Sequence, residues 1–160
     1  SVQCGDHTSM TDLAANGAVG EVWSVFNDSA VCCNFSGGFG LRRNLKFDFY
    51  NAVTGLQLTR ENWSKGGGLK TLHIQRALLL LGGPDLKWNP KVHDDNPSRF
   101  YEPLPSGPYK GKAVDRASVR ESVQKYYEEL GWDENGVPKS KTLKKLGLED
   151  VDKALRKLRK

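Results

Sequence analysis

Three cysteines and a histidine near the start of the chain carry side chains that can bind metals. Cys4 and His7 lie three residues apart, and Cys32 and Cys33 are adjacent. Three thiolates and one imidazole suffice for a structural zinc ion. The chain has no paired C-x-x-C motif, however, and isolated cysteines are often small buried apolar residues. A small zinc-binding protein is therefore one alternative for this sequence.

Asp28 lies five residues before Cys33 and is the second group of interest. Taken alone, it is typical of a helix cap, because its carboxylate can accept hydrogen bonds from free backbone amides. Adjacent Cys32 and Cys33 rarely form a disulfide with each other, since the ring is strained. We therefore expect free thiols, a reducing compartment and a cytoplasmic location.

The charge of the chain is unevenly distributed. Its 160 residues carry a formal net charge of +5, yet residues 1–41 contain no Lys or Arg. The basic excess ends in residues 153–160, and neither interleaved aromatic residues nor a known motif accompanies it. We therefore expect no nucleic-acid partner. The longest apolar run, 77–81, is too short to span a membrane, so we expect no membrane partner.

Helical periodicity predicts an all-α, irregular helical domain with a long wrapping loop. Residues 42–83 predict two helices: one with Leu45, Phe49, Ala52 and Val53 on its apolar face, and one kinked by glycines 66–68. Residues 84–114 contain six of the seven prolines and predict an ordered loop that covers another part of a larger protein.

The last segment, 115–160, predicts further helices. Asp115 is placed to cap a helix whose apolar face ends at Leu130, and Gly131 is placed to end it. Asn135 and Gly136 predict a turn, and two short helices follow. The first segment, 1–41, predicts a helix over about 15–26 that is rich in small residues.

Several of these motifs, in the same order, resemble the C-terminal region of the aldehyde ferredoxin oxidoreductase family. Residues 28–33 resemble the family's Asp-x-x-Gly-Leu-Cys pattern, with Val31 in place of Gly and Cys32 in place of Leu. Residues 5–7 resemble its Gly-x-Asp-His segment. Residues 126–138, with a double tyrosine and a Gly-Trp-Asp turn, are the best match. The spacing between His7 and Asp28 is similar to that in class II benzoyl-coenzyme A reductase catalytic subunits, a branch of the family.

The resemblance implies a site. Asp28 corresponds to the acid that contacts a pterin, and Cys33 to the cysteine that ligates a 4Fe–4S cluster, with Cys32 as the alternative ligand. His7 corresponds to a proton donor near the metal, a role that suits imidazole. Residues 1–41 would line a tungsten–bis-pterin, and the remainder would cover it.

The same resemblance implies an oxidoreductase that acts on an aldehyde or an aromatic acyl-coenzyme A. Its partners would be the missing N-terminal region of the same enzyme and ferredoxin or electron-transfer subunits. The family's other three cluster cysteines form a C-x-x-C-x-x-x-C motif that these residues lack, so we expect the 160 residues alone to be inactive. The alternatives are a non-catalytic helical interaction module and the zinc-binding protein.

Overall fold

The computed structural model describes residues 18, 20, 22, 24–33, 45–85 and 87–159. Within them, helices provide almost all regular structure, and a lone antiparallel bridge joins Trp132 to Pro138. The predicted all-α fold is confirmed. The chain order is a helical stretch at 24–29, then α2 (Leu45–Thr54), α3 (Arg60–Asn62), a π-helical turn (Trp63–Gly67), α4 (Gly68–Leu81), α5 (Pro90–His93), a 3-10 turn (Ser98–Tyr101), α6 (Arg116–Leu130), α7 (Ser140–Lys145) and α8 (Glu149–Leu155).

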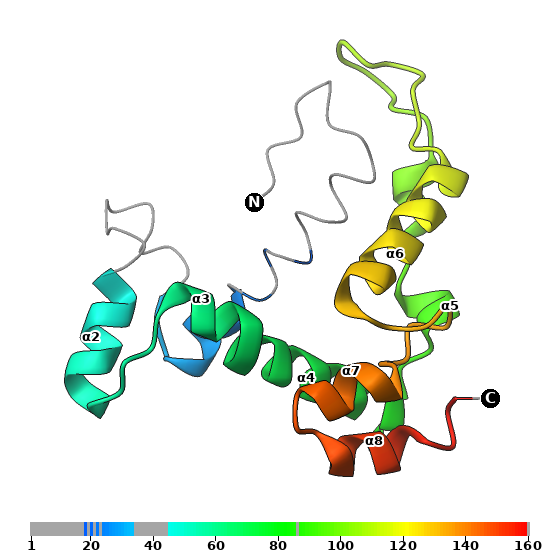
Figure 1. Cartoon of the computed structure of the whole chain (residues 1–160). Coiled ribbons are helices and arrows are strands. Elements are labelled where there is room, and N and C mark those ends of the chain that lie inside the picture. The colour runs from blue at the N-terminus through cyan, green and yellow to red at the C-terminus, as the bar shows by residue number, and fades with distance from the viewer. Residues whose placement is uncertain are drawn as a thin grey trace.

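Helix α4 is the central element and joins two apolar clusters. Figure 1 shows it running from the region of α2 and α3 to that of α7 and α8, with α6 to one side. Leu72 packs in the first cluster, and Ala77 and Leu80 pack in the second. The other buried members are Ala18, Val22, Val25, Tyr127, Leu130 and Trp132 in the first cluster, and Val137, Leu143 and Leu155 in the second.

The predicted glycine kink lies where the helical chain passes from α3 into α4. Thr59 forms a capping box with Asn62 before α3, and the chain then passes through the π-helical turn into α4. Gly68 permits close packing here, since a Cβ at this position would lie 2.6 Å from Val22 Cγ1. The glycines thus distort the helix and bring it against the N-terminal segment.

The structure confirms the predicted cap at each end of α6. The Asp115 carboxylate accepts a hydrogen bond from the Ser118 backbone amide, and Gly131 ends the helix with φ of 71°. Leu130, at the end of the predicted apolar face, is buried together with Val119 and Tyr127. The capping residues therefore determine the bounds of this helix from local chemistry alone.

The predicted loop at 84–114 is more structured than expected, because it contains α5 and the 3-10 turn. Beyond them, residues 102–114 form an arm that projects away from α6 (Figure 1). The Leu104 backbone amide donates to Lys112 O at 2.9 Å, and the Gly111 amide donates to Leu104 O at 2.9 Å. The arm exposes Leu104, Tyr109 and Val114. That it covers another part of a larger protein stays a prediction.

A buried polar network fastens this loop to α4 and α6. Arg76 donates to Asp94 Oδ1 at 3.0 Å and to Gly136 O at 2.9 Å, and its second terminal nitrogen pairs with Asp94 Oδ2. Trp88 Nε1 donates to Asp94 at 2.7 Å, and the Tyr127 hydroxyl donates to the same carboxylate. Burial alone would raise the pKa of Asp94, but the hydrogen bonds from Arg76, Tyr127 and Trp88 outweigh it and lower that pKa.

His73 is the second polar group of the core and is fully buried. Its Nδ1 lies 2.8 Å from Leu69 O, and its Nε2 lies 3.0 Å from Leu130 O, so the ring links α4 to the end of α6. Burial lowers the pKa of His73, and the two backbone carbonyls oppose this shift. A neutral imidazole donates to only one carbonyl at a time.

None of the helices in the described part of the chain is long and apolar enough to cross a membrane.

Candidate functional site

The segment that carries Asp28 and Cys33 begins as a helix and ends in a turn. Residues 24–29 are helical. The Ala30 amide donates to Phe26 O at 2.9 Å, and the Cys32 amide donates to Asn27 O at 2.7 Å. These bonds close the helix and turn the chain just before Cys33. Local backbone geometry therefore sets the position of this cysteine.

Val31 makes this turn with φ of 55°, a value that β-branched residues rarely adopt. In the described residues it is the only non-glycine with positive φ. It stands where the resembled motif has glycine, so the chain keeps a glycine-like backbone without the glycine. Such a conformation costs a non-glycine residue about 1–2 kcal/mol. The Val31 side chain is 93% exposed, so core packing does not offset this cost.

Asp28 lies in the last turn of the helical stretch 24–29 rather than before its first turn. The interpretation of Asp28 as an N-terminal helix cap is therefore wrong. A carboxylate at this end meets the negative end of the helix dipole, which is an unfavourable arrangement. The side chain is exposed. The helix dipole therefore does not favour an acid at this position.

Lys46 connects α2 to the cysteine segment, a role that the sequence analysis did not identify. Its ammonium donates to Asn27 Oδ1 at 2.8 Å and to Cys33 O at 3.4 Å. Nearby, the Phe26 and Phe47 rings stack at 4.1 Å between centroids. Only a spatial contact links residues 27 and 33 to residue 46, so no local sequence signal could have revealed this lysine.

An open hollow of about 530 Å³ lies between the cysteine segment and α2. Cys32 and Cys33 line one side, and Phe49 and Val53 line the other. Phe49 and Val53 are 62% and 86% exposed, and Phe47 is the buried residue of α2. The predicted apolar face of this helix is therefore not buried: Phe49, Ala52 and Val53 are exposed, and Phe49 and Val53 line the hollow beside the cysteines.

The two cysteines in the described residues differ in exposure. Cys32 is half-buried and its Sγ lies 3.6 Å from Ala30 O, whereas Cys33 is exposed. Within the described residues, neither is in a disulfide bond. Across the described ranges, no group of three or more His, Cys, Asp or Glu side chains could hold a metal ion. Cys4 and His7 lie outside these residues, so the zinc set and the predicted proton donor stay predictions.

The donor set nevertheless fits one edge of an iron–sulfur and pterin site. An exposed thiol can supply a single soft ligand to a cluster, and an exposed carboxylate can accept hydrogen bonds from the N–H groups of a pterin. One thiol leaves three cluster positions for ligands elsewhere. The apolar surface around Cys33 is suited to burial under a cofactor or another protein segment.

Comparisons with known proteins agree with the predicted family. Residues 7–148 match the family described as "Aldehyde ferredoxin oxidoreductase, domains 2 & 3". The "Aliphatic sulfonate oxidoreductase, WOR-like subunit" of Pyrococcus furiosus is 49% identical over the whole chain, which covers 25% of that relative. The "Tungsten-containing aldehyde ferredoxin oxidoreductase" of the same organism is 37% identical over 77% of the chain, which covers 19% of that relative. The one from Pyrococcus horikoshii is 35% identical, with the same coverage of both chains. The chain thus spans a quarter or less of the length of these relatives.

Proposed function

The chain belongs to the aldehyde ferredoxin oxidoreductase family, and from this we propose that it forms the C-terminal part of a tungsten–bis-pterin, 4Fe–4S oxidoreductase. Cys33 ligates the cluster, Asp28 binds a pterin and His7 moves protons. The missing N-terminal region of the enzyme supplies the other three cysteines. When bound, the tungsten centre supplies two-electron chemistry and the cluster carries single electrons.

The exposed thiol of Cys33 beside an exposed apolar surface is the observation that carries this proposal. Val31 and Val53 are 93% and 86% exposed on either side of the hollow. Covering apolar groups of such exposure with another surface is favourable, because it removes them from water. Another part of a larger protein could cover this surface, because most of each relative lies outside the matched part.

Each residue has a separate task in the proposed site. The Cys33 thiolate provides one iron ligand, and the contact of Lys46 with Cys33 O holds the backbone of that ligand in place. The Asp28 carboxylate accepts pterin hydrogen bonds and thereby orients the ring. Asp28 lies in the last helical turn and Cys33 directly after the turn that follows, so the hydrogen bonds of this turn position the ligand relative to the carboxylate.

The names of the relatives support a proposal for the substrate class. Relatives with 35–37% identity are named for aldehydes, and the relative with 49% identity is named for aliphatic sulfonates. We infer that the complete protein oxidises an aldehyde or an aliphatic sulfonate. Electrons leave through ferredoxin or an electron-transfer subunit. The benzoyl-coenzyme A branch gains no support from these relatives.

A pair of cysteine variants tests the ligand. In the complete protein loaded with its cofactors, Cys33→Ala should lose the 4Fe–4S cluster or convert it to a 3Fe–4S form. Iron analysis and electron paramagnetic resonance would measure this change. Cys32→Ala is the matched control and should keep a normal spectrum. If only Cys32→Ala altered the cluster, Cys32 would be the ligand. An intact cluster in both variants would contradict the assignment of either cysteine as a ligand, and absence of a cluster from the unaltered complete protein would favour the non-catalytic module.

The pterin assignment has its own test. Asp28→Asn keeps the size of the side chain but replaces one acceptor oxygen with a donor, so tungsten and pterin content should fall while iron content is retained. Asp48→Asn on α2, also exposed, is the control and should retain both. Full tungsten and pterin content in Asp28→Asn would contradict the assignment.

A further inference from the structure

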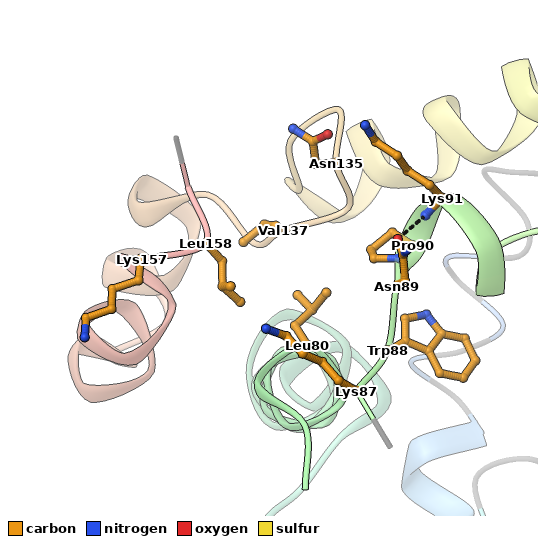
Figure 2. A pocket seen from close by; sticks show the side chains of 10 residues that line it. All are labelled: Leu80, Lys87, Trp88, Asn89, Pro90, Lys91, Asn135, Val137, Lys157 and Leu158. Atoms are coloured by element: carbon orange, nitrogen blue, oxygen red, sulfur yellow. Dashed lines mark hydrogen bonds between the residues drawn. The ribbon is translucent and has the colours of Figure 1, made fainter. Parts of the chain in front are cut away.

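A second hollow, of about 550 Å³, lies at the C-terminal end of α4, away from Cys33. Leu80 and Val137 are buried beneath it, and Leu158 of the C-terminal segment is half-buried beside them. Figure 2 shows these three side chains converging between α4, the turn after Asn135 and the last residues of the chain. A pocket of this size is typical of small-molecule sites.

The wall of this hollow is held by specific contacts. The Trp88 backbone amide donates to Leu79 O at 3.1 Å, and its indole donates to Asp94 at 2.7 Å. The Asn89 side chain accepts a hydrogen bond from the Lys91 backbone amide. These bonds fix the position of the indole, so a ligand would not have to order this wall on binding.

The rim carries positive charge. Lys87, Lys91 and Lys157 line the hollow, and no acidic residue is among its described lining residues. In Figure 2, the Lys91 side chain extends toward Asn135, away from the Lys87 ammonium, so the two positive charges lie on different parts of the rim. Neither Lys87 nor Lys91 forms an ion pair within the residues that the structure describes. By contrast, Lys65, Lys125 and Lys153 each pair with a Glu or Asp.

We propose that this hollow binds a small organic anion that has an apolar body and one carboxylate-like group. The apolar body lies on Leu80, Val137 and Leu158, beside the Trp88 indole, and the positive charge of the rim lysines Lys87 and Lys91 attracts the acid. An uncharged ligand would leave both ammonium groups without a partner, and a cation would be repelled. The site is distinct from that of Cys33, because α4 is about 20 Å long and separates them.

Equilibrium dialysis of the complete protein with 2-naphthoate tests this proposal, and its neutral analogue 2-naphthalenemethanol provides the comparison. The two probes share an apolar body and differ in charge. We expect 2-naphthoate to bind at least about fivefold more tightly at low salt and to lose this advantage as salt screens the lysines. Equal affinities, or no binding of either probe because another segment fills the hollow, would overturn the proposal.

Paired variants locate the binding site. The double variant Lys87→Gln/Lys91→Gln should raise the dissociation constant of 2-naphthoate at least about fivefold. It should leave the dissociation constant of 2-naphthalenemethanol unchanged. Lys141→Gln with Lys145→Gln on α7 removes the same charge outside the hollow and is the control. If both double variants weakened 2-naphthoate equally, net charge rather than this hollow would attract it, and the proposal would fail.

Discussion

Removing the Asp94 carboxylate should loosen the junction between α4, α6 and the loop that carries α5. In Asp94→Ala, Arg76 keeps its buried charge but loses its ion-pair partner, and the Trp88 indole and Tyr127 hydroxyl lose their acceptor. The Arg76 and Asp94 side chains are only 6% and 14% exposed, so water replaces little of the lost interaction. Breaking such a buried pair costs about 3–5 kcal/mol.

Hydrogen exchange measured by mass spectrometry can detect this loss in the complete protein, because it reports local opening. A loss of about 3 kcal/mol raises the exchange rate roughly a hundredfold. Peptides from α4 and α6 should show this increase, while α2 serves as the internal reference. Asp95→Ala is the matched control: Asp95 pairs with Arg116, which is 47% exposed, and surface pairs are worth at most about 1 kcal/mol.

Two results would refute this reasoning. The first is an Asp94→Ala protein whose α4 and α6 exchange no faster than in Asp95→Ala. The second is a failure of Arg76→Met with Asp94→Leu to recover part of the lost protection, because removing both charges should relieve the unpaired cation. A pH series provides a further check. The folded-state pKa of Asp94 is lowered, so its contribution is present above about pH 4 and is lost as pH falls through that pKa.

Three further predictions concern single residues. Burial lowers the pKa of His73, so the unfolded chain takes up this proton first. Stability should therefore decrease as pH falls below about 6.5, and denaturant titrations at several pH values should show a shallower decrease in His73→Phe. Gly136→Ala should lower the melting temperature more than Gly55→Ala: both glycines have positive φ, but only at Gly136 would a Cβ clash, with Arg76 and Tyr127. Equal shifts would show that backbone conformation alone matters there. Val31→Gly should slow hydrogen exchange of residues 24–33, because it relieves up to about 1 kcal/mol of backbone strain. Val53 is an exposed valine inside α2, so Val53→Gly should destabilise that helix by about 1 kcal/mol and speed its exchange. A change of the same sign in both variants would contradict the strain at Val31.

Local chemistry in the sequence was enough to predict much of the helical framework. Asp115 and Gly131 bound α6, and the glycines at 66–68 lie where the π-helical turn joins α4. These predictions succeed because caps and glycine conformations depend on neighbours a few residues away. The family pattern around Asp28 and Cys33 is likewise a local feature, and it identified the segment of interest.

Tertiary structure decided which faces are buried and which distant groups meet. Periodicity placed Phe49 and Val53 on an apolar face, but the fold buries Phe47 and leaves both of them exposed beside the cysteines. The pairing of Arg76 with Asp94 and the contact of Lys46 with Cys33 join residues 18 and 13 positions apart. A one-dimensional pattern records which side chains are apolar or charged, whereas burial and pairing depend on where the packed helices bring them.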